Sequence, residues 1–245
     1  MCYYNSLTIK KKELAQKYAL LEEKVPEFAP IVIASGFEIP IWPILTAQQP
    51  DRFIKATWGL IPAWIKTDEQ AMKLRISTLN ARSETIHEKP AFKAASNLAQ
   101  RCLIPSTGFF EWQTVGKKKY PYFIYIENQP IFSMAGLWEE WTDEKNVVHH
   151  TFSILTVEAN PLMAQIHNTK KRMPAILPDK QAQLWLDTTL PVRDAARLLR
   201  PFDSAGLKAH TIRPIGGKTS KGESSSVHEP YTYPELSGQL SIFGS

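Results

Sequence analysis

The sequence predicts an α+β fold, a single compact domain built around a mostly antiparallel sheet. The chain has 245 residues, of which 43% are hydrophobic, and this is enough to bury a sizeable core. From about Ile31 short β-like runs follow one another, and the chain contains 18 prolines, a pattern that argues against a regular parallel sheet. Helical periodicity occurs before and after this strand-rich region, and no internal repeat is visible.

The first predicted element is an amphipathic helix from Lys11 to Lys24. Leu14, Tyr18, Leu21 and Val25 follow the spacing of a buried helical stripe. The middle of the chain is predicted to form strands.

Two of these strands, Tyr122–Glu127 and Ile131–Trp138, flank Asn128-Gln129-Pro130, and we expect them to pair as a β-hairpin. Thr151–Val157 is expected to add a further strand.

The C-terminal third is predicted to contain two short helices and a last strand. The helices are expected at Asp179–Leu186 and Val192–Leu199, and the strand at Lys208–Pro214. From Gly216 the composition changes to Gly, Ser, Lys and Pro, which is typical of a flexible tail. We therefore expect a folded domain over residues 1–215 and a flexible tail over residues 216–245.

Cysteine usage and charge narrow the functional class. Only Cys2 and Cys102 occur, which gives no disulfide framework, and neither a signal peptide nor an apolar stretch of spanning length is visible. We expect a cytoplasmic monomer, associated with the nucleoid if bacterial, with no membrane partner. The formal charge of +5 favours the approach of a polyanion but does not identify a nucleic-acid binder. Cys102 lies in an apolar run and is expected in the core.

Two weak motifs are rejected, and we expect neither a metal nor another cofactor. Gly217-Lys218-Thr219 resembles part of a phosphate loop, but Ile212 stands where that pattern needs a glycine. His149-His150 has no Cys-x-x-Cys or His-Glu-x-x-His context, and exposed polar residues explain it better than metal ligands do.

The second residue, Cys2, offers distinctive chemistry. Removal of Met1 by an aminopeptidase is expected because the next side chain is small, and it leaves an amine with a pKa of about 7.7–8.0 beside a thiol with a pKa of about 8.5. Such a 1,2-aminothiol captures aldehydes: the amine forms an imine, and the thiolate closes on it to give a thiazolidine. The alternative is a cysteine that stands second by chance.

Three internal segments place polar groups in apolar surroundings. An extended backbone would put Asn80 and Arg82 on one face, where Asn80 could hold an amine and Arg82 could clamp a phosphate. A turn asparagine and a surface arginine are the alternative. Glu111 stands among bulky aromatics, and burial there would raise its pKa into the range useful for acid–base catalysis. The alternative is a position on the solvent-exposed face of a strand, where the pKa of Glu111 would keep its ordinary value.

The third segment begins at His167. This histidine could donate a proton to a departing sugar oxygen, while Lys170, Lys171 and Arg172 would supply charge that faces phosphates. A capping or structural histidine is the alternative reading.

Together with Cys2, these segments resemble the SRAP family, the SOS response-associated peptidase-like proteins that shield abasic sites in single-stranded DNA. The resemblance covers roughly Met1 to Pro214, and the joint occurrence of its motifs in this order is specific. Family members commonly follow the cysteine with Gly-Arg, whereas this chain has Tyr3-Tyr4. The phosphate contact of that arginine is therefore not carried over to this chain, and Tyr3 or Tyr4 could stack on a base instead. The motifs are Met1-Cys2, Trp58-Gly59-Leu60-Ile61-Pro62, Asn80-Ala81-Arg82-Ser83-Glu84, Gly108-Phe109-Phe110-Glu111-Trp112, and His167 followed by Arg172-Met173-Pro174-Ala175-Ile176-Leu177.

The resemblance implies a barrel-like β core with peripheral helices and a covalent reaction with DNA. Trimmed Cys2 would form a thiazolidine with the aldehyde of a ring-opened abasic site and so shield the site during the DNA damage response. By analogy His167 would assist sugar ring opening, Asn80 would orient the amine, and Glu111 would move protons during imine formation and reversal. Lyase-type strand scission is the side reaction that ring closure suppresses.

Single-stranded DNA is the expected partner. Stacking faces beside Arg82 and the Lys170–Arg172 cluster could come from Trp58, Trp64, Trp112 and Phe110, although at least half of the tryptophans are expected in the core. Family resemblance adds Pro40 as part of a surface that wedges DNA.

The end of the chain suggests a second partner. Gln239-Leu240-Ser241-Ile242-Phe243 resembles the short peptide by which bacterial DNA-handling proteins bind the replicative sliding clamp. Leu240, Ile242 and Phe243 would be its apolar anchors, and Gln239 its polar start. The alternative is that these apolar residues pack back on the domain.

Two other functional classes remain open. A cysteine or N-terminal-nucleophile peptidase would use Cys2, His167 and Glu111 on an acyl substrate, with removal of Met1 as a self-processing event. A non-catalytic binder of single-stranded DNA would keep the aromatic and basic surface but would be indifferent to Cys2→Ala.

Overall fold

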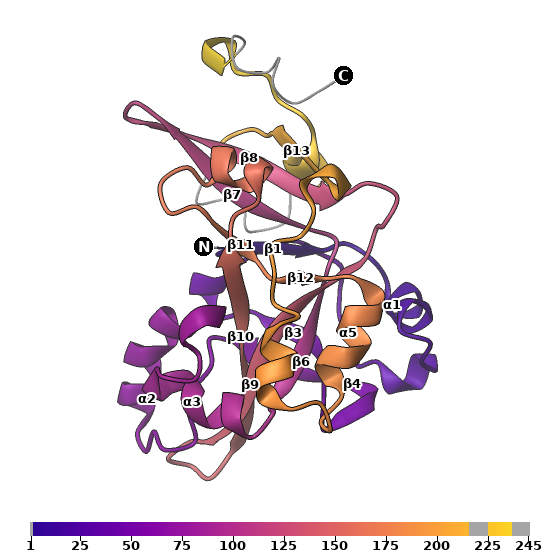
Figure 1. Ribbon diagram of the computed structural model, residues 1–245, viewed down its shortest axis with the longest axis vertical. Coiled ribbons are helices and arrows are strands. Elements are labelled where there is room, and N and C mark those ends of the chain that lie inside the picture. The colour runs from indigo at the N-terminus through magenta and orange to yellow at the C-terminus, as the bar shows by residue number, and fades with distance from the viewer. Residues whose placement is uncertain (1, 216–224, 237–245) are drawn as a thin grey trace.

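A five-stranded barrel forms the base of the molecule. The structure is a computed structural model that describes residues 2–215 and 225–236 (Figure 1). In the barrel β10 pairs with β4, and the order then continues through β3, β6 and β9 back to β10. The barrel strands are β3 (Ile41–Thr46), β4 (Gln49–Trp58), β6 (Arg101–Ser106), β9 (Phe132–Thr142) and β10 (Val148–Glu158).

The long strand β10 extends beyond the barrel. Its first part pairs with β9 and β4, whereas its last residues pair in parallel with β5 and antiparallel with β11. In this register Ile154 is opposite Asn80, and Glu158 is opposite Arg172. The short strands involved are β5 (Asn80–Arg82) and β11 (Arg172–Pro174), and β12 (Ile176–Leu177) pairs with β9.

A second sheet of five antiparallel strands lies above the barrel in Figure 1. Its β1 contains the residues just after Cys2, and its β7 follows β6 after one residue, so the chain passes directly from barrel to sheet. In spatial order the strands are β13 (Leu207–Thr211), β8 (Lys118–Ile126), β7 (Gly108–Val115), β1 (Tyr4–Leu7) and β2 (Ile31–Ser35).

Short helices surround the barrel, with α2 and α3 on one side and α1 and α5 on the other (Figure 1). Local signals explain where they begin: the Thr67 side chain accepts a hydrogen bond from Gln70 N at the start of α2, and Asn160 caps α4 with Pro161 at its first turn. The helices are α1 (Lys11–Lys17), α2 (Asp68–Arg75), α3 (Pro90–Asn97), α4 (Pro161–Ile166), α5 (Asp179–Leu186) and α6 (Val192–Ala196).

Several predicted elements are confirmed. The strand expected at Thr151–Val157 lies within β10, α5 has the predicted bounds, and β13 covers most of the predicted last strand. The second predicted C-terminal helix is shorter than expected, since α6 ends at Ala196. Cys102 is fully buried, as predicted.

The predicted helix over Lys11–Lys24 is wrong in its second half. Helix α1 ends at Lys17, because Ala19 has a φ of 53°, which lies outside the helical region. The chain then makes a short 3₁₀ turn, and Leu21, which the periodicity had placed in the buried stripe, is 63% exposed.

The predicted hairpin between Tyr122–Glu127 and Ile131–Trp138 is also wrong. Both segments are strands, but β8 pairs with β7 and β13, whereas β9 pairs with β6, β10 and β12 in the barrel. The connection after Asn128, whose φ is 60°, therefore joins two sheets and does not close a hairpin.

The predicted tail contains an ordered segment, residues 225–236, which we call the strap. Its Val227 and Leu236 are buried, and Tyr231 N donates to Thr211 O at 2.8 Å, beside β13. The expectation of a flexible tail is therefore wrong for the strap. The proposed clamp-binding peptide, from Gln239 to Phe243, lies outside the described residues.

No helix in the described part of the chain combines the length and the apolar character that crossing a membrane requires.

Gly136 on β9 is a point of close approach inside the barrel. It pairs with Cys102 on one side and with Ile154 on the other, and a Cβ there would lie 2.3 Å from Ile104 Cδ1 and 2.8 Å from Ser153 O. Any larger residue must therefore push neighbouring strands apart.

We predict that Gly136→Ala lowers the free energy of unfolding by about 3 kcal/mol, because the added methyl overpacks the barrel. Gly116→Ala is the control: its Cβ meets nothing within 4 Å, and only its φ of 58° opposes the change, at about 1 kcal/mol. Urea denaturation of both variants measures the difference, and equal losses would contradict close packing at Gly136.

Candidate active site

Cys2 is held at the entrance of β1 by Asn80. Asn80 Nδ2 donates to the backbone oxygen of Cys2 at 2.9 Å, and both residues are buried. Asn80 reaches this position because β5 pairs with the part of β10 that extends beyond the barrel. Within the described residues Asn80 Oδ1 is buried and has no hydrogen-bond partner, so it can accept from a nearby amine.

The Cys2 thiol is not an exposed, ionised nucleophile. It is fully buried, and Sγ donates to Tyr4 O at 3.5 Å. Burial, followed by the negative charge of Glu111, raises the pKa of the Cys2 thiol far above its ordinary value. The sulfur therefore stays protonated near neutral pH until the surroundings of the residue change.

Glu111 faces the same place from β7. Alternation along this strand turns Glu111 toward Cys2 and Phe110 toward the opposite, apolar side of the sheet. Burial raises the pKa of Glu111 to about 7, so the carboxyl exists in both protonation states near neutral pH. A group of this kind can give and take a proton within one reaction.

His167 follows the last residue of α4 and approaches Glu111. Its Nε2 lies 4.0 Å from Glu111 Oε2, and its Nδ1 lies 2.9 Å from the backbone oxygen of Arg172. A carbonyl oxygen only accepts, so Nδ1 carries the hydrogen; this shorter contact outweighs the 3.3 Å approach of Arg172 N to the same nitrogen. Burial lowers the pKa of His167 to about 4, which leaves a neutral ring with Nε2 as an acceptor.

An open pocket of about 360 Å³ adjoins these groups. Two tyrosines form part of its wall: Tyr3 packs against Phe37, and Tyr4 packs against Trp112, each pair with ring centroids 4.9 Å apart. Aromatic rings and ammonium groups thus surround one acid–base pair. The residues that line the pocket are Tyr3, Tyr4, Glu111, Trp112, Thr114, Lys119, His167, Thr169 and Lys170.

The comparisons with known proteins agree with this geometry. A family model described as SOS response associated peptidase (SRAP) matches residues 1–217. The chain belongs to the SRAP family. The abasic site processing protein YoqW of Bacillus subtilis is 34% identical over 171 residues, which are 69% of this chain and 73% of that protein. The abasic site processing protein HMCES of Rattus norvegicus is 32% identical over 198 residues, and the match covers 69% of this chain and 54% of the rat protein.

Solved structures share the fold. A protein from Bacteroides thetaiotaomicron has a TM-score of 0.83 and 36% identity, covering 94% of this chain and 100% of that one. A protein from Bordetella bronchiseptica has a TM-score of 0.77 and 25% identity, covering 87% of this chain. The predicted SRAP fold, a single compact α+β domain with a barrel-like β core, is confirmed.

Three residues that we expected to contact DNA lie in the interior of this SRAP protein instead. Phe110 is fully buried in an apolar cluster, so it offers no stacking face. Trp58 is 1% exposed, its Nε1 donates to Leu79 O at 2.8 Å, and its ring packs against Phe152, so no base can stack on it. Arg172 is also buried and forms a bidentate pair with Glu84, at 2.7 and 2.9 Å, which leaves its guanidinium unavailable for phosphate.

The other residues that we expected to contact DNA are at least partly accessible, and their contact with DNA stays a prediction. Trp112 and Lys170 line the pocket, and Arg82 is exposed two residues after Asn80 on β5. Lys171 is exposed and Pro40 is half-buried. Neither is part of the pocket wall.

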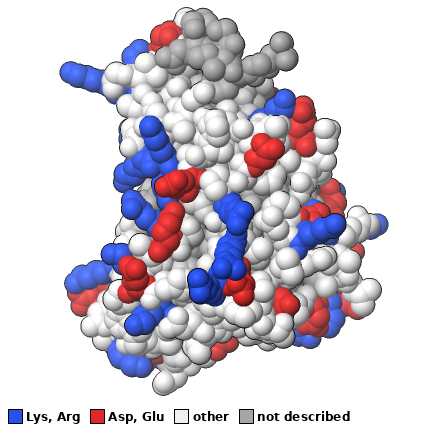
Figure 2. Space-filling model, viewed as in Figure 1, with Lys and Arg blue, Asp and Glu red and all other residues white. Residues whose placement is uncertain are grey.

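Sequence reasoning missed three residues of the pocket wall, namely Thr114, Thr169 and Lys119. Lys119 belongs to the run Lys117-Lys118-Lys119, which was the available signal for a basic contribution from the turn between β7 and β8. Basic and acidic side chains alternate over the face shown in Figure 2, so the positive charge there does not form one continuous patch.

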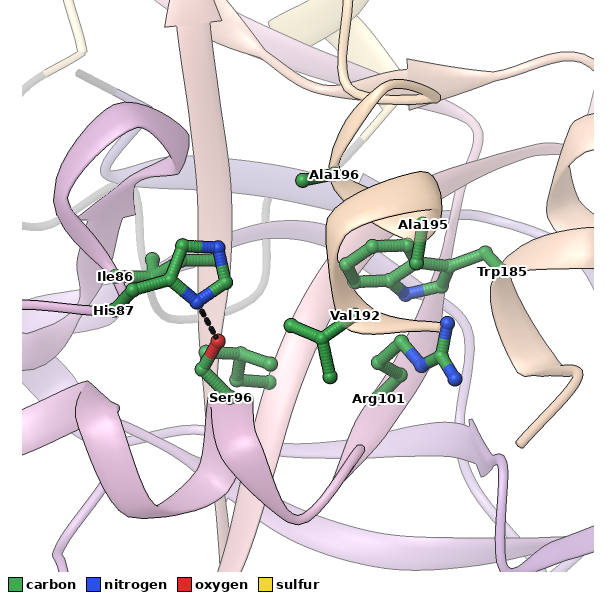
Figure 3. Close-up of a pocket in the computed structure, with 9 residues that line it drawn as sticks. Ile86, His87, Ser96, Arg101, Trp185, Val192, Ala195 and Ala196 are labelled. Atoms are coloured by element: carbon green, nitrogen blue, oxygen red, sulfur yellow. Dashed lines mark hydrogen bonds between the residues drawn. The ribbon is translucent and has the colours of Figure 1, made fainter. Parts of the chain in front are cut away.

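A second cavity, between α3, α5 and α6, is too small for a substrate (Figure 3). Its volume is about 10 Å³, enough for one water. Within it His87 Nδ1 and Ser96 Oγ are hydrogen-bonded at 2.8 Å, and Arg101 donates to the backbone oxygens of Asp187 and Leu190. In the described part of the chain no group of three or more His, Cys, Asp or Glu could hold a metal ion.

We predict that Glu111→Gln changes the pH dependence of stability. Between about pH 4.5 and 7 the unfolded carboxyl ionises while the folded one keeps its proton, so the wild type loses stability as pH rises through this window. The variant lacks this loss. Above pH 7 its free energy of unfolding should therefore have risen by about 3 kcal/mol relative to that of the wild type.

Urea denaturation between pH 4.5 and 8 measures this gain, and the exposed Glu140→Gln serves as the matched control. A difference between Glu111→Gln and wild type that does not grow with pH would contradict a raised pKa at Glu111.

Proposed function

We propose that this SRAP protein processes abasic sites in single-stranded DNA by forming a thiazolidine between trimmed Cys2 and the sugar aldehyde. The observation that supports this most is the hydrogen bond from Asn80 to the backbone of Cys2, beside an acid–base pair and an open pocket. The relatives YoqW and HMCES are named abasic site processing proteins, which supports an abasic site as the substrate.

The reaction begins with opening of the sugar. In a closed abasic sugar the anomeric hydroxyl must lose a proton and the ring oxygen must gain one. Neutral His167, with Nε2 as an acceptor, is suited to take the first proton, and protonated Glu111 is suited to supply the second. The sequence had suggested His167 as the proton donor; its lowered pKa favours the role of base.

The amine of Cys2 then attacks the aldehyde. The carbon–nitrogen bond forms first: the aldehyde oxygen takes the proton that His167 holds, and the Glu111 carboxylate takes one from the amine nitrogen, which gives a neutral carbinolamine. Glu111 then returns its proton to the hydroxyl, which leaves as water, and accepts the remaining nitrogen proton, so that a neutral imine results. Asn80 Oδ1 can accept a hydrogen bond from the amine and direct its lone pair to the carbonyl carbon.

The thiol of Cys2 closes the ring. Sulfur bonds to the imine carbon, and its proton passes to nitrogen, so the net reaction releases one water. Because burial holds the thiol protonated, the amine reacts before the sulfur. The closed ring has no C=N bond to acidify the neighbouring carbon, and strand scission by β-elimination is suppressed.

The pocket is suited to an unpaired strand. Tyr3, Tyr4 and Trp112 offer aromatic faces on which a base can stack only after it leaves a duplex. Lys119 and Lys170 provide charge beside these rings for the phosphates.

A peptidase reaction at Cys2 is less favoured by the same geometry. Cysteine peptidases rely on a thiolate that is stabilised next to a positively charged histidine. Here the thiol pKa is raised and the His167 pKa is lowered, which opposes such an ion pair.

We predict that trimmed wild type forms a heat-stable adduct with an abasic single strand, whose mass equals protein plus oligonucleotide minus one water. Cys2→Ser keeps the amine but lacks the sulfur, so its stable adduct should fall by about tenfold or more, with an imine that survives only after borohydride reduction. Intact mass spectrometry and denaturing gels measure both species.

Cys102→Ala removes the other, core cysteine and should leave the adduct unchanged. An adduct of equal yield and heat stability in Cys2→Ser, or none in the wild type, would refute the thiazolidine.

We also propose that the segment after the strap binds the sliding clamp through Leu240, Ile242 and Phe243. The strap is packed on the domain up to Leu236, so this short peptide follows directly from a fixed point.

We predict that Phe243→Ala weakens binding to purified clamp by about tenfold or more, since aromatic anchors dominate such contacts. Surface plasmon resonance measures the affinity, with Ser245→Ala as the control. Failure of the wild type to bind would remove this partner.

A further inference from the structure

Strand β7 loses its neighbour where it passes the active site. β1 pairs with β7 only at Gly108, Phe109 and Phe110, so the later residues of β7 on this side extend beyond β1. At Thr114 a side chain takes the place of a strand. Asn168 Oδ1 accepts from Thr114 N at 3.1 Å, and Asn168 Nδ2 donates to Thr114 O at 2.8 Å.

This double hydrogen bond connects the two segments that hold the acid–base pair. Asn168 directly follows His167, and Thr114 lies three residues after Glu111 on one strand. An amide that pairs with both backbone groups of one residue fixes direction as well as distance. The contact therefore restrains how far His167 Nε2 can move from Glu111 Oε2, which lies 4.0 Å away.

The loop of residues 167–171, which we call the His167 loop, is anchored separately at its other end. Lys171 N donates to His167 O at 2.8 Å and closes the loop, and Arg172 is fixed by its bidentate pair with Glu84. Lys171 has a φ of 49°, an uncommon conformation for a residue with a side chain, so the loop depends on its surroundings to keep its shape. The pair between Asn168 and Thr114 supplies such support on the side of β7.

We propose that Asn168 is a positioning residue that holds His167 against Glu111 by pairing with the backbone of Thr114. Asn168 does not line the pocket and acts through His167, so its loss should affect the chemical step and leave DNA affinity intact. The inference rests on the proposed function for its kinetic readout.

The kinetic test uses full-length, Met1-trimmed protein and an abasic single strand. Asn168→Ala should form the adduct about 10- to 100-fold more slowly, because a misplaced general base loses most of its effect. Its affinity for a single strand with an abasic analogue that has no aldehyde, measured by fluorescence anisotropy, should equal the affinity of the wild type. Asn168→Asp keeps the acceptor for Thr114 N but loses the donor to Thr114 O. Its rate of adduct formation should therefore lie between those of Asn168→Ala and wild type. Asn97→Ala, at an exposed site in α3, is the matched control.

A double-mutant cycle separates positioning from a general loss of structure. If Asn168 acts through His167, then Asn168→Ala should cause no further slowing in a His167→Ala background. An equal slowing in both backgrounds, or an Asn168→Ala rate equal to wild type, overturns the proposal.

A spectroscopic readout stays informative if the wild type forms no adduct, an outcome that refutes the proposed function and not the positioning role. In wild type, NMR titration should show His167 with a pKa near 4, whereas in folded Asn168→Ala the looser loop admits water and the pKa should rise toward the ordinary 6.5. An unchanged titration of His167 overturns the positioning role by itself.

Discussion

Closure of the five-stranded barrel is the constraint on which the rest of the molecule depends. Because β10 completes the barrel with β9 and β4, its direction is fixed, and its last residues extend beyond the barrel toward the second sheet. This end of β10 pairs with β5, which carries Asn80, and with β11, which carries Arg172. The second sheet supplies Glu111 on β7 and the start of β1 at Cys2, so the site forms where the two sheets meet.

Burial then determines the chemistry of these groups. The same removal of water makes the Glu111 carboxyl hold its proton more strongly, the His167 ring neutral and the Cys2 thiol un-ionised. A neutral base next to a carboxyl with a pKa of about 7 is suited to moving protons on a sugar at physiological pH. In the proposed reaction such a protected thiol reacts last, after the amine has formed an imine.

Local features of the sequence predicted a good part of the fold. Helix α5 and the strands at Thr151–Val157 and Lys208–Pro214 have clear periodicity or clear boundaries, and the structure has elements there. Which strands pair with each other was harder to predict from the sequence, because β8 and β9 are neighbours in sequence but belong to different sheets. The strap was hidden by its Gly- and Ser-rich context, since only isolated residues such as Val227 and Leu236 become buried.

Long-range pairs explain the errors at the site. Arg172 stands in a basic run that is typical of a surface, yet its partner Glu84 lies 88 positions away in the sequence and takes it into the interior. Trp58 is fixed by Leu79 in the same way. The sequence alone allowed us to single out four site residues because each stands in a family motif, namely Cys2, Asn80, Glu111 and His167. The contact of Asn168 with Thr114 could not be predicted in this way, because it depends on where β1 ends in the fold.

The central claim is that the sugar carbon ends up bonded to both nitrogen and sulfur of Cys2. The most direct measurement is NMR of the adduct formed from DNA labelled with ¹³C at the aldehyde carbon of the abasic site and protein labelled with ¹⁵N. We expect the labelled carbon to become saturated and to couple to the α-nitrogen of Cys2. A carbon that stays doubly bonded to nitrogen, or one attached to any other residue, would contradict the account.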